Sequence, residues 1–219
     1  MQDGFHPPLE EYLEAIHELE EEGTPVIQAR LAERLGHSPP SVSEMIGRLK
    51  ADGYIRLEGR QVRLTPPGRE RAVSVVRKHR LAERLLTDVI GVEWHKVHAE
   101  ACRWEHVISD DVEARLVKLL GNPATCPHGN PIPGAAPPRT DLDPLAEVAP
   151  GDRVRLERVT ELVEIDAEAS EYLSRHGFVP GARAEVLERG PDGTVTLDLG
   201  DGTISLGAAL AQQIYVKVG

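Results

Sequence analysis

Four potential metal ligands lie within nine positions of this chain: His98, Cys102, Glu105 and His106. On a helix that turns about 100° per residue, their side chains fall within an arc of about 100° and share one face. His79 and Glu83 form a second pair at i, i+4 spacing one helix earlier. Imidazole, thiolate and carboxylate together suit a borderline transition metal better than Ca²⁺ or Mg²⁺, which prefer oxygen ligands. Each residue alone would fit a solvated polar face, but the set predicts a divalent-metal site.

Composition sets broad limits on the fold. With 219 residues and 40% hydrophobic side chains, the chain can form one large domain or two to three small ones. No apolar run approaches the roughly 18 residues of a membrane span, and no secretion signal is visible at the N-terminus. We therefore expect a soluble, cytoplasmic protein. In that compartment Cys102 and Cys126 are expected to be thiols rather than a disulfide, Cys126 being either an ordinary loop residue or part of a site.

Charge is distributed very unevenly along the chain. The net charge of −11 alone argues against nucleic-acid binding. Residues 1–22, however, carry 8 acidic and no basic side chains, whereas residues 23–80 carry 12 Lys or Arg against 5 Asp or Glu. Residues 81–219 are acidic again. A basic block within an acidic chain predicts a local anion-binding surface.

The basic block has the pattern of a winged helix-turn-helix. Helices are predicted over 9–22, 26–35 and 40–52, followed by a β-hairpin over 54–65 with a glycine in its turn. Polar side chains on the outer face of the third helix fit a major groove, and Arg60 at the hairpin tip can reach phosphate or the minor groove. The predicted DNA-contacting residues are Ser38, Pro40, Ser41, Ser43, Glu44, Arg48 and Arg60. A small protein-binding αβ domain is the alternative.

The remaining chain predicts a mainly α protein with a small β domain. Apolar stripes predict a long helix over 65–90 and two more near 94–109 and 110–120, which suit a dimer surface. Prolines and glycines make 121–150 read as a linker, and short strands after it predict a small β-barrel. The domain boundaries follow from these patterns: 1–73 winged helix-turn-helix, 74–140 helical dimerisation and metal-binding domain, 141–150 linker, and 151–219 barrel.

The chain resembles the diphtheria-toxin-repressor family of iron- and manganese-dependent transcriptional repressors. The resemblance rests on four segments: Glu-Glu-Tyr-Leu at 10–13, the run at 77–86, the ligand-rich run at 96–106 and Gly-Asn-Pro-Ile-Pro-Gly at 129–134. It covers the first two thirds almost continuously, and the last third resembles the SH3-like (FeoA-like) domain of the family more loosely. The resemblance implies a homodimer, with two dimers on one double-stranded operator as a possible arrangement.

The resemblance also implies two metal sites per subunit. The primary site would use Glu11, Cys102, Glu105 and His106. The ancillary site would use His79, Glu83, His98, Glu161 and Glu164. Arg80 and Asn130 are implied to hold an assisting anion. Metal would tie the first helix to the later ones, fix the DNA-reading head relative to its twin, and so repress genes of metal homeostasis.

The ligand types leave the metal open between Mn²⁺ and Fe²⁺. Glu11 stands where the iron-sensing branch has methionine, and this hard carboxylate favours Mn²⁺, whereas the Cys102 thiolate favours Fe²⁺, Co²⁺ or Zn²⁺. We favour Mn²⁺, with an iron-selective regulator as the alternative. Glu164 replaces a glutamine of the iron branch, and Cys126 replaces a common serine of the anion site. Glu14 fits a solvated helix position better than a ligand.

Three further alternatives remain at this point. A metalloenzyme would need a separate base, nucleophile or phosphate loop, none of which the sequence shows, so no enzyme is expected. A winged-helix regulator that binds a small organic ligand would use the polar residues only structurally. The barrel could bind proline-rich segments such as 131–138, or supply Glu161 and Glu164 to the ancillary site.

Overall fold

The basic block forms a winged helix-turn-helix in the computed structural model, which describes residues 8–135 and 141–219. Its elements are α1 (Pro8–Glu21), α2 (Gln28–Leu35), α3 (Pro39–Ala51), β1 (Ile55–Glu58) and β2 (Gln61–Leu64). The Ser38 hydroxyl caps α3 by accepting a hydrogen bond from the N–H of Ser41. The two strands pair antiparallel around a turn at Gly59 and Arg60. The predicted fold of this region is confirmed.

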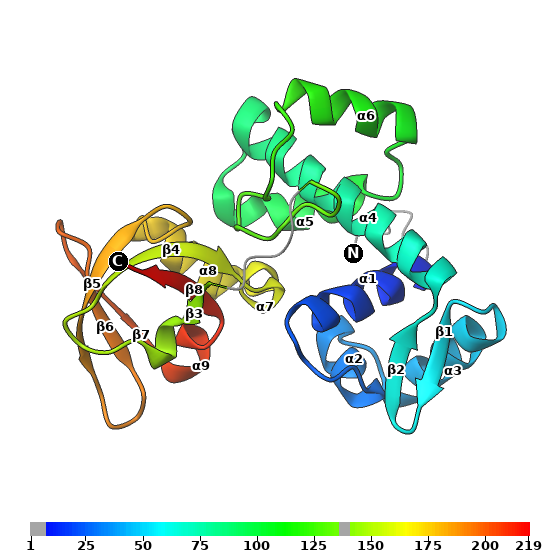
Figure 1. The fold of residues 1–219 in the computed structure, drawn as a ribbon, viewed down its shortest axis with the longest axis horizontal. Helices are drawn as coiled ribbons and strands as arrows, with labels where there is room; N and C mark the ends of the chain where they lie inside the picture. The colour runs from blue at the N-terminus through cyan, green and yellow to red at the C-terminus, as the bar shows by residue number, and fades with distance from the viewer. Residues whose placement is uncertain (1–7, 136–140) are drawn as a thin grey trace.

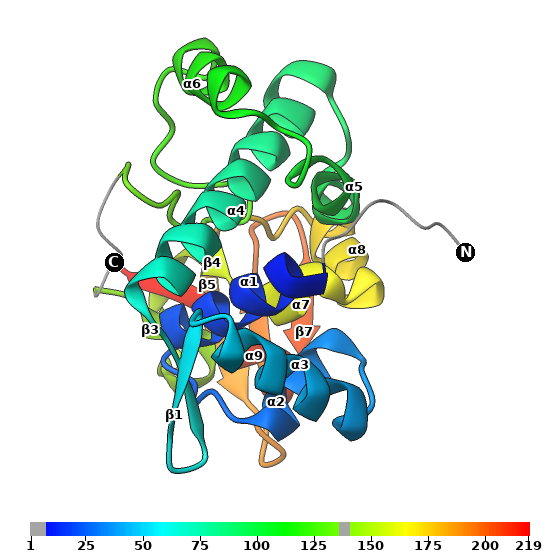
Figure 2. The same cartoon turned by 90° about the vertical axis from the view of Figure 1, so that its right-hand side faces the viewer.

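Helix α1 belongs to two parts of the molecule at once. Tyr12, Leu13, Ile16 and Leu19 are buried in the core of the winged helix-turn-helix. The opposite side of the helix faces the long helix α4 (Pro66–Leu85), and Figure 2 shows α1 lying between α4 and the DNA-reading helices. A movement of α1 relative to α4 therefore moves the DNA-binding head.

The second part of the chain is helical. After α4 come a π-helical segment (Leu86–Ile90), a 3-10 turn (Trp94–Lys96), α5 (Val97–Trp104) and α6 (Asp110–Leu119). The helix predicted over 94–109 is shorter than expected and ends at Trp104. The predicted helix cannot continue to residue 109, because Ser109 caps α6 from an extended conformation. Its hydroxyl accepts a hydrogen bond from the N–H of Val112. Glu105 and His106 consequently lie just beyond α5.

Residues 121–135 correct the prediction of an irregular linker. Cys126, His128, Asn130 and Ile132 are buried, and the N–H of Cys126 donates to the carbonyl of Asn130 at 2.8 Å. We call residues 126–130 the buried turn. Proline and glycine excluded helix and strand here but did not exclude a compact turn whose polar groups find partners in the next domain. The predicted boundary at 140, and part of the 131–138 segment, lie outside the described residues.

The buried turn is docked on the last domain. The N–H of Val159 donates to the carbonyl of His128 at 3.0 Å. Gly129 has a φ of +90°, and a Cβ there would lie 1.9 Å from the carbonyl oxygen of Glu157. Only glycine permits this close approach.

The last part of the chain is a small antiparallel β structure, as predicted. Six strands pair in the order β3-β8-β4-β5-β6-β7. The elements are β3 (Asp143–Pro144), a 3-10 turn (Leu145–Glu147), β4 (Arg153–Val159), α7 (Glu161–Ile165), α8 (Ala167–Arg175), β5 (Arg183–Arg189), β6 (Val195–Asp198), β7 (Thr203–Leu206), α9 (Ala208–Ala211) and β8 (Ile214–Val218). The short helix α7 was not predicted. It projects from the sheet toward α5 and α1 (Figure 1), so it brings side chains of the last domain to the other two.

None of the helices in the described ranges is both long enough and apolar enough to span a membrane.

Candidate metal centre and DNA-facing surface

The first group of candidate ligands joins α1 to the region around α5. We call Glu10, Glu14, His79, Glu105 and His106 the Glu105 cluster. The Nδ1 atom of His79 lies 2.5 Å from Glu105 Oε2, and His106 Nε2 lies 3.0 Å from Glu105 Oε1. His106 Nδ1 lies 2.8 Å from Glu10 Oε2. Glu14, His79 and Glu105 each offer one ligand atom within 4.8 Å of the others.

The α1 residues in this cluster differ from the one that the sequence suggested. Among the described residues, Glu11 belongs to none of the groups that place three or more ligand atoms within 4.8 Å. Glu10 and Glu14 face the cluster instead, and they lie four residues apart on one side of α1. A purely solvated Glu14 does not agree with this placement. The role of Glu11 stays a prediction.

Cys102 lies between the two predicted sites. Its Sγ atom is 3.5 Å from Nε2 of His98, and it forms a possible ligand group with His79 and His98. The sequence placed Cys102 and Glu105 on one helix face. In the structure each of them lies near His79, and His79 is the neighbour that they share. Burial opposes ionisation of the thiol, but the charges of His98 and His79 lower the pKa of Cys102.

A second group of candidate ligands lies where α4, α5 and α7 meet the buried turn. We call His79, Glu83, His98, Glu161, Glu164, Cys126 and His128 the Glu83 cluster. His98 Nδ1 lies 3.0 Å from Glu161 Oε1 and 3.5 Å from Glu164 Oε2. Glu83 Oε1 lies 3.4 Å from His79 Nε2 and 3.0 Å from His128 Nδ1. The five residues predicted for the ancillary site are thus brought together from three elements.

The two clusters share His79 and are almost continuous. Its Nδ1 atom faces Glu105 and its Nε2 atom faces Glu83. The Glu105 cluster borders a surface depression lined in part by Glu10, Glu105 and His106. Glu83 is 0% exposed and Glu164 is 5% exposed, so most of the Glu83 cluster is buried, whereas His98 is only partly buried.

Burial and like charges shape the ionisation of the carboxyl groups. Burial, together with the charge of Glu105, raises the pKa of Glu14 well above its usual range. Burial and the neighbouring Glu164 do the same to the pKa of Glu161. Burial also opposes the ionisation of Glu105, but hydrogen bonds from His106 and His79 lower its pKa to about 2. Carboxylates that are held this close together are the kind of charge that a divalent cation neutralises.

The same carboxylates shift the pKa values of the histidines. Burial favours neutral imidazole, yet the charge of Glu83 raises the pKa of His79 well above its usual value. Glu164 and Glu83 raise the pKa of His128 in the same way. In the other direction, the His128 and His79 charges outweigh burial and hold the pKa of Glu83 well below its usual range. Without a cation, protons on the imidazoles balance the buried carboxylates.

The residues predicted to hold an anion contact protein groups. Arg80 Nη2 donates to Glu21 Oε2 at 2.6 Å, and its Nη1 donates to the carbonyl of Pro131 at 2.5 Å. Asn130 Nδ2 donates to Glu164 Oε1 at 2.5 Å and to the carbonyl of Val159 at 3.1 Å. An anion at this position would need to compete with Glu21 and Glu164.

Sequence reasoning missed Glu10 and His128, and it interpreted Glu14 as a solvated residue. Glu10 and Glu14 could have been recognised from their i, i+4 spacing on the face of α1 opposite Tyr12 and Ile16. His128 lies two residues after Cys126, and this short Cys-x-His spacing was the only signal for it. It was overlooked because the surrounding prolines were interpreted as a linker.

The predicted DNA-contacting surface is exposed. On α3, Ser41, Ser43, Glu44 and Arg48 are exposed, whereas Val42, Ile46 and Leu49 are buried. Arg60 is exposed at the tip of the hairpin. Behind α3, the hydroxyl of Tyr12 and the Nδ1 atom of His37 share a hydrogen bond of 2.9 Å, which connects α1 to the turn before α3. The surface that faces outward and the helix that carries the candidate ligands are therefore mechanically connected.

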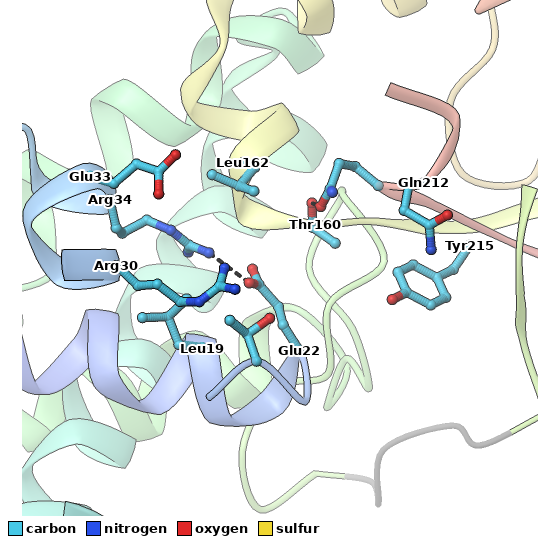
Figure 3. A pocket seen from close by; sticks show the side chains of 11 residues that line it. Leu19, Glu22, Arg30, Glu33, Arg34, Thr160, Leu162, Gln212 and Tyr215 are labelled. Atoms are coloured by element: carbon cyan, nitrogen blue, oxygen red, sulfur yellow. Dashed lines mark hydrogen bonds and ion pairs between the residues drawn. The ribbon is translucent and has the colours of Figure 1, made fainter. Parts of the chain in front are cut away.

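A pocket separates the DNA-binding head from the last domain. Figure 3 shows Arg34 paired with Glu22 on one wall and Thr160, Gln212 and Tyr215 on the other. The Arg34–Glu22 pair is short, at 2.6 Å. Polar side chains predominate here, and we assign no ligand to this pocket.

A winged helix-turn-helix joined to buried clusters of histidine, cysteine and glutamate defines a metal-responsive DNA-binding regulator. Models of three domains match the chain in order. They are the N-terminal DNA-binding domain of iron-dependent repressors at residues 5–61, the metal-binding and dimerisation domain of the same proteins at 65–134, and the FeoA domain at 144–218.

Whole-chain comparisons agree with these matches. The iron-dependent repressor IdeR of Mycobacterium tuberculosis is 46% identical, with 95% of this chain and 96% of that protein covered. The diphtheria toxin repressor of Corynebacterium diphtheriae is 42% identical over the same shares. A solved manganese-dependent transcriptional repressor in complex with manganese has a TM-score of 0.85 at 34% identity, covering 96% of this chain and 100% of that one. The chain belongs to the iron-dependent repressor family.

Membership confirms the resemblance that the sequence suggested, and with it metal-dependent transcriptional repression as the function. The partners are operator DNA and a second copy of the chain. Several large apolar side chains of the helical domain are exposed in the single chain: Val89, Ile90, Val107, Val112 and Leu119. They fit a surface that a second copy covers.

Proposed function

We propose that this protein represses genes of metal homeostasis when Mn²⁺ binds between α1 and the α4–α5 region. The position of α1 carries the proposal. One side of this helix lies in the core of the DNA-binding head, and the other side places Glu10 and Glu14 against His106, His79 and Glu105. An ion held across this junction would fix the head relative to the dimer surface.

The donor set fits a divalent ion. The buried imidazole nitrogens His79 Nε2 and His98 Nδ1 lie 3.4 Å from Glu83 Oε1 and 3.0 Å from Glu161 Oε1, respectively. A divalent cation would take up these imidazole and carboxylate donors in place of the imidazole protons. Metal binding then favours the arrangement in which donors of α1 and α5 meet, which is a population shift driven by differential affinity.

Two sites per subunit account for the donors. We assign Cys102, Glu105, His106 and an α1 carboxylate, Glu11 or Glu14, to the primary site. The ancillary site uses His79, Glu83, His98, Glu161 and Glu164. The assignment of α7 carboxylates to this site favours a metal role for the last domain over binding of the 131–138 segment. Such a role also agrees with the proposed boundaries of the DNA-binding, helical and barrel domains, which place each site at a junction.

The oxygen-rich primary set favours Mn²⁺. Glu14 and Glu105 are hard ligands beside His79. The Cys102 thiol supports Fe²⁺ as the alternative, and the named relatives include both iron- and manganese-dependent repressors.

For DNA, we propose that α3 enters the major groove through Ser38, Pro40, Ser41, Ser43, Glu44 and Arg48, and that Arg60 contacts the backbone or minor groove. Two dimers on one operator remain part of this proposal.

The test is an anaerobic titration of chelator-treated protein with Mn²⁺ or Fe²⁺ in the presence of a labelled duplex. That duplex is first selected from a random pool with Mn²⁺-loaded protein. We expect a rise in DNA affinity of about 5- to 150-fold on metal binding, the usual range of allosteric coupling. An unchanged affinity with both ions would refute the proposal. A larger response to Fe²⁺ would keep the mechanism and reverse the metal assignment.

A further inference from the structure

Four cationic side chains surround a hollow on the outer face of the last domain's sheet. Arg153, Arg155, Arg183 and Lys217 line this hollow, which has a volume of about 630 Å³, and all four are exposed. Residues 151–219 carry 12 Asp or Glu against only 7 Lys or Arg, so an acidic domain gathers most of its cations in one place. Such a local concentration of positive charge predicts an anion-binding surface.

Three of these cations form a row across neighbouring strands. Arg155 of β4 lies directly opposite Lys217 of β8 and directly opposite Arg183 of β5. Side chains at paired positions have Cβ atoms about 4.5–5.5 Å apart, and like charges at such positions destabilise a sheet. The register therefore lowers the stability of the free chain, and an anion that lies along the row would remove this repulsion.

The nearby carboxylates neutralise the row only in part. Arg155 pairs with Glu157, and Lys217 Nζ lies 3.4 Å from Asp141 Oδ2. The second pair is exposed on both sides, and ion pairs of this kind contribute little stability. Arg183 has no ion pair within the part of the chain that the structure describes. Positive charge is thus left over for a ligand.

The shape of the hollow limits what can bind there. The row lies on β8, β4 and β5, which are inner strands of the sheet, so no free edge is offered to an added peptide strand. None of the described residues that line the hollow is aromatic, whereas SH3-like recognition of proline-rich segments uses aromatic grooves. The next row places Glu185 opposite both Arg153 and Asp198, and these carboxylates oppose a long polyanion such as DNA. A compact anion fits best.

We propose that the hollow binds a small molecule with two or more linked phosphate groups. Arginine holds phosphate oxygens through two parallel hydrogen bonds, and lysine adds a point charge. A row on three adjacent strands spans about 10 Å, so a short phosphate chain can contact each cation, whereas a single phosphate reaches only part of the row. The volume of the hollow suits a ligand of this size.

The proposed site is separate from the metal clusters. Arg153 is at the start of β4, and Val159, which contacts the buried turn, is at its end. Six residues of an extended strand span about 20 Å. Figure 1 shows the C-terminus near the start of β4 and α7 near its end. Binding in the hollow can therefore be tested without changing any candidate metal ligand.

The test is a calorimetric titration of metal-free, full-length protein with sodium tripolyphosphate. The compared proteins are the wild type, R155Q, R183Q, the double variant and the control R175Q, which changes an exposed arginine on α8 that pairs with Glu171. We expect the wild type to bind one tripolyphosphate per chain. Affinity should fall about tenfold in each single variant and further in the double variant, because each loses hydrogen bonds to a charged group. R175Q should bind like the wild type.

Two further ligands identify the chemistry that is recognised. Equal affinity for ATP and tripolyphosphate would support recognition of the phosphate chain alone, and tighter binding of ATP would assign the site to a nucleotide. Orthophosphate should bind at least about tenfold more weakly, because it reaches only part of the row. If orthophosphate bound as tightly as tripolyphosphate, the site would take single anions and the proposal would be wrong.

The double variant also decides where the ligand binds. Equal tripolyphosphate binding by the wild type and the double variant would place the ligand elsewhere, such as on the DNA-binding head, and would overturn the proposal. Absence of binding would do so too. If only hexaglutamate or an unrelated DNA duplex bound, and the double variant lost that binding, the partner would be an acidic protein or DNA instead. R183Q removes a like-charge contact, so the Tm of the ligand-free protein should not fall; a large fall would contradict the unneutralised row.

Discussion

The Glu105 cluster and the Glu83 cluster share His79 but are assembled by different parts of the chain. The first takes two of its three carboxylates, Glu10 and Glu14, from α1, which also lies in the DNA-binding core. The second takes its carboxylates from α4 and α7 and its remaining donors from α5 and the buried turn. The first borders a surface depression, whereas most of the second is buried and His98 is its partly exposed member. We therefore expect a cation in the first cluster to act on the DNA-reading head, and a cation in the second to act on attachment of the last domain.

The largest expected effect comes from Glu105→Gln. This change removes the carboxylate that faces both His79 and His106, so Mn²⁺-dependent DNA affinity should fall by about 5- to 150-fold. Fluorescence anisotropy with a selected duplex measures it. Glu100→Gln, on the helix α5 that precedes Glu105, is the matched control because Glu100 contacts only Arg103 and Trp104 in the described bonds. Equal losses in both variants would mean that the effect is not due to the cluster.

Glu161→Gln tests the role of the Glu83 cluster. It removes the carboxylate that lies 3.0 Å from His98 Nδ1. We expect metal affinity of the second cluster to fall by about tenfold, with a smaller loss of DNA affinity because α1 keeps its own donors. Isothermal titration with Mn²⁺ resolves the two classes of site. Glu168→Gln on the exposed side of α8 serves as control. If DNA affinity fell as far as in Glu105→Gln, the two clusters would not have separate roles.

The stabilities of the metal-free and metal-bound forms should depend differently on pH. The raised pKa values of His79 and His98, and of the Glu14 and Glu161 carboxyls, mean that the metal-free fold binds more protons than the unfolded chain. Its stability therefore falls as pH rises through those folded-state values. Mn²⁺ replaces the protons, so its stabilising effect should grow between about pH 6 and about pH 8. A gain of about 1 kcal/mol corresponds to about 2–4 °C in Tm. If the difference in Tm with and without Mn²⁺ did not change with pH, this prediction would be contradicted.

The smallest expected effect is that of Tyr12→Phe. It removes the hydrogen bond to His37 while keeping the buried ring, at a cost of about 0.5–1.5 kcal/mol in unfolding free energy. Metal affinity should be unchanged, and the metal-induced gain in DNA affinity should shrink by a few-fold. Urea unfolding and the anisotropy titration check the two parts. Weaker Mn²⁺ binding would show instead that Tyr12 supports the ligands themselves.

Periodic patterns predicted some parts of the molecule well. The spacing of Val42, Ile46 and Leu49 and the cap at Ser38 identified α3 because both depend on local sequence. The ligand run at 98–106 was recognised for its chemistry, although its helix ends early at Trp104. The residue types and their spacing therefore predicted the correct class of protein.

Other parts depend on contacts between distant segments. Helix α7 is only five residues long, and no period can be read from so short a segment. His128 became visible only when the buried turn was seen to pack on β4 and beside Glu83. Which α1 carboxylate faces the cluster depends on how α1 lies against α4, so the choice of Glu11 over Glu10 and Glu14 could not be derived from the local sequence of α1.

Gly129 connects the packing of the last domain to the shape of the proposed ancillary site, although the glycine itself supplies no ligand. Because its backbone touches the Glu157 carbonyl region of β4, the segment that carries Cys126 and His128 has its correct shape only while β4 is in place. With Glu161 and Glu164 as proposed ligands, we expect cation occupancy and attachment of the last domain to be linked equilibria, each strengthening the other by the same factor. Limited proteolysis should accordingly slow as the cation concentration rises, and a larger residue at 129 should abolish that protection.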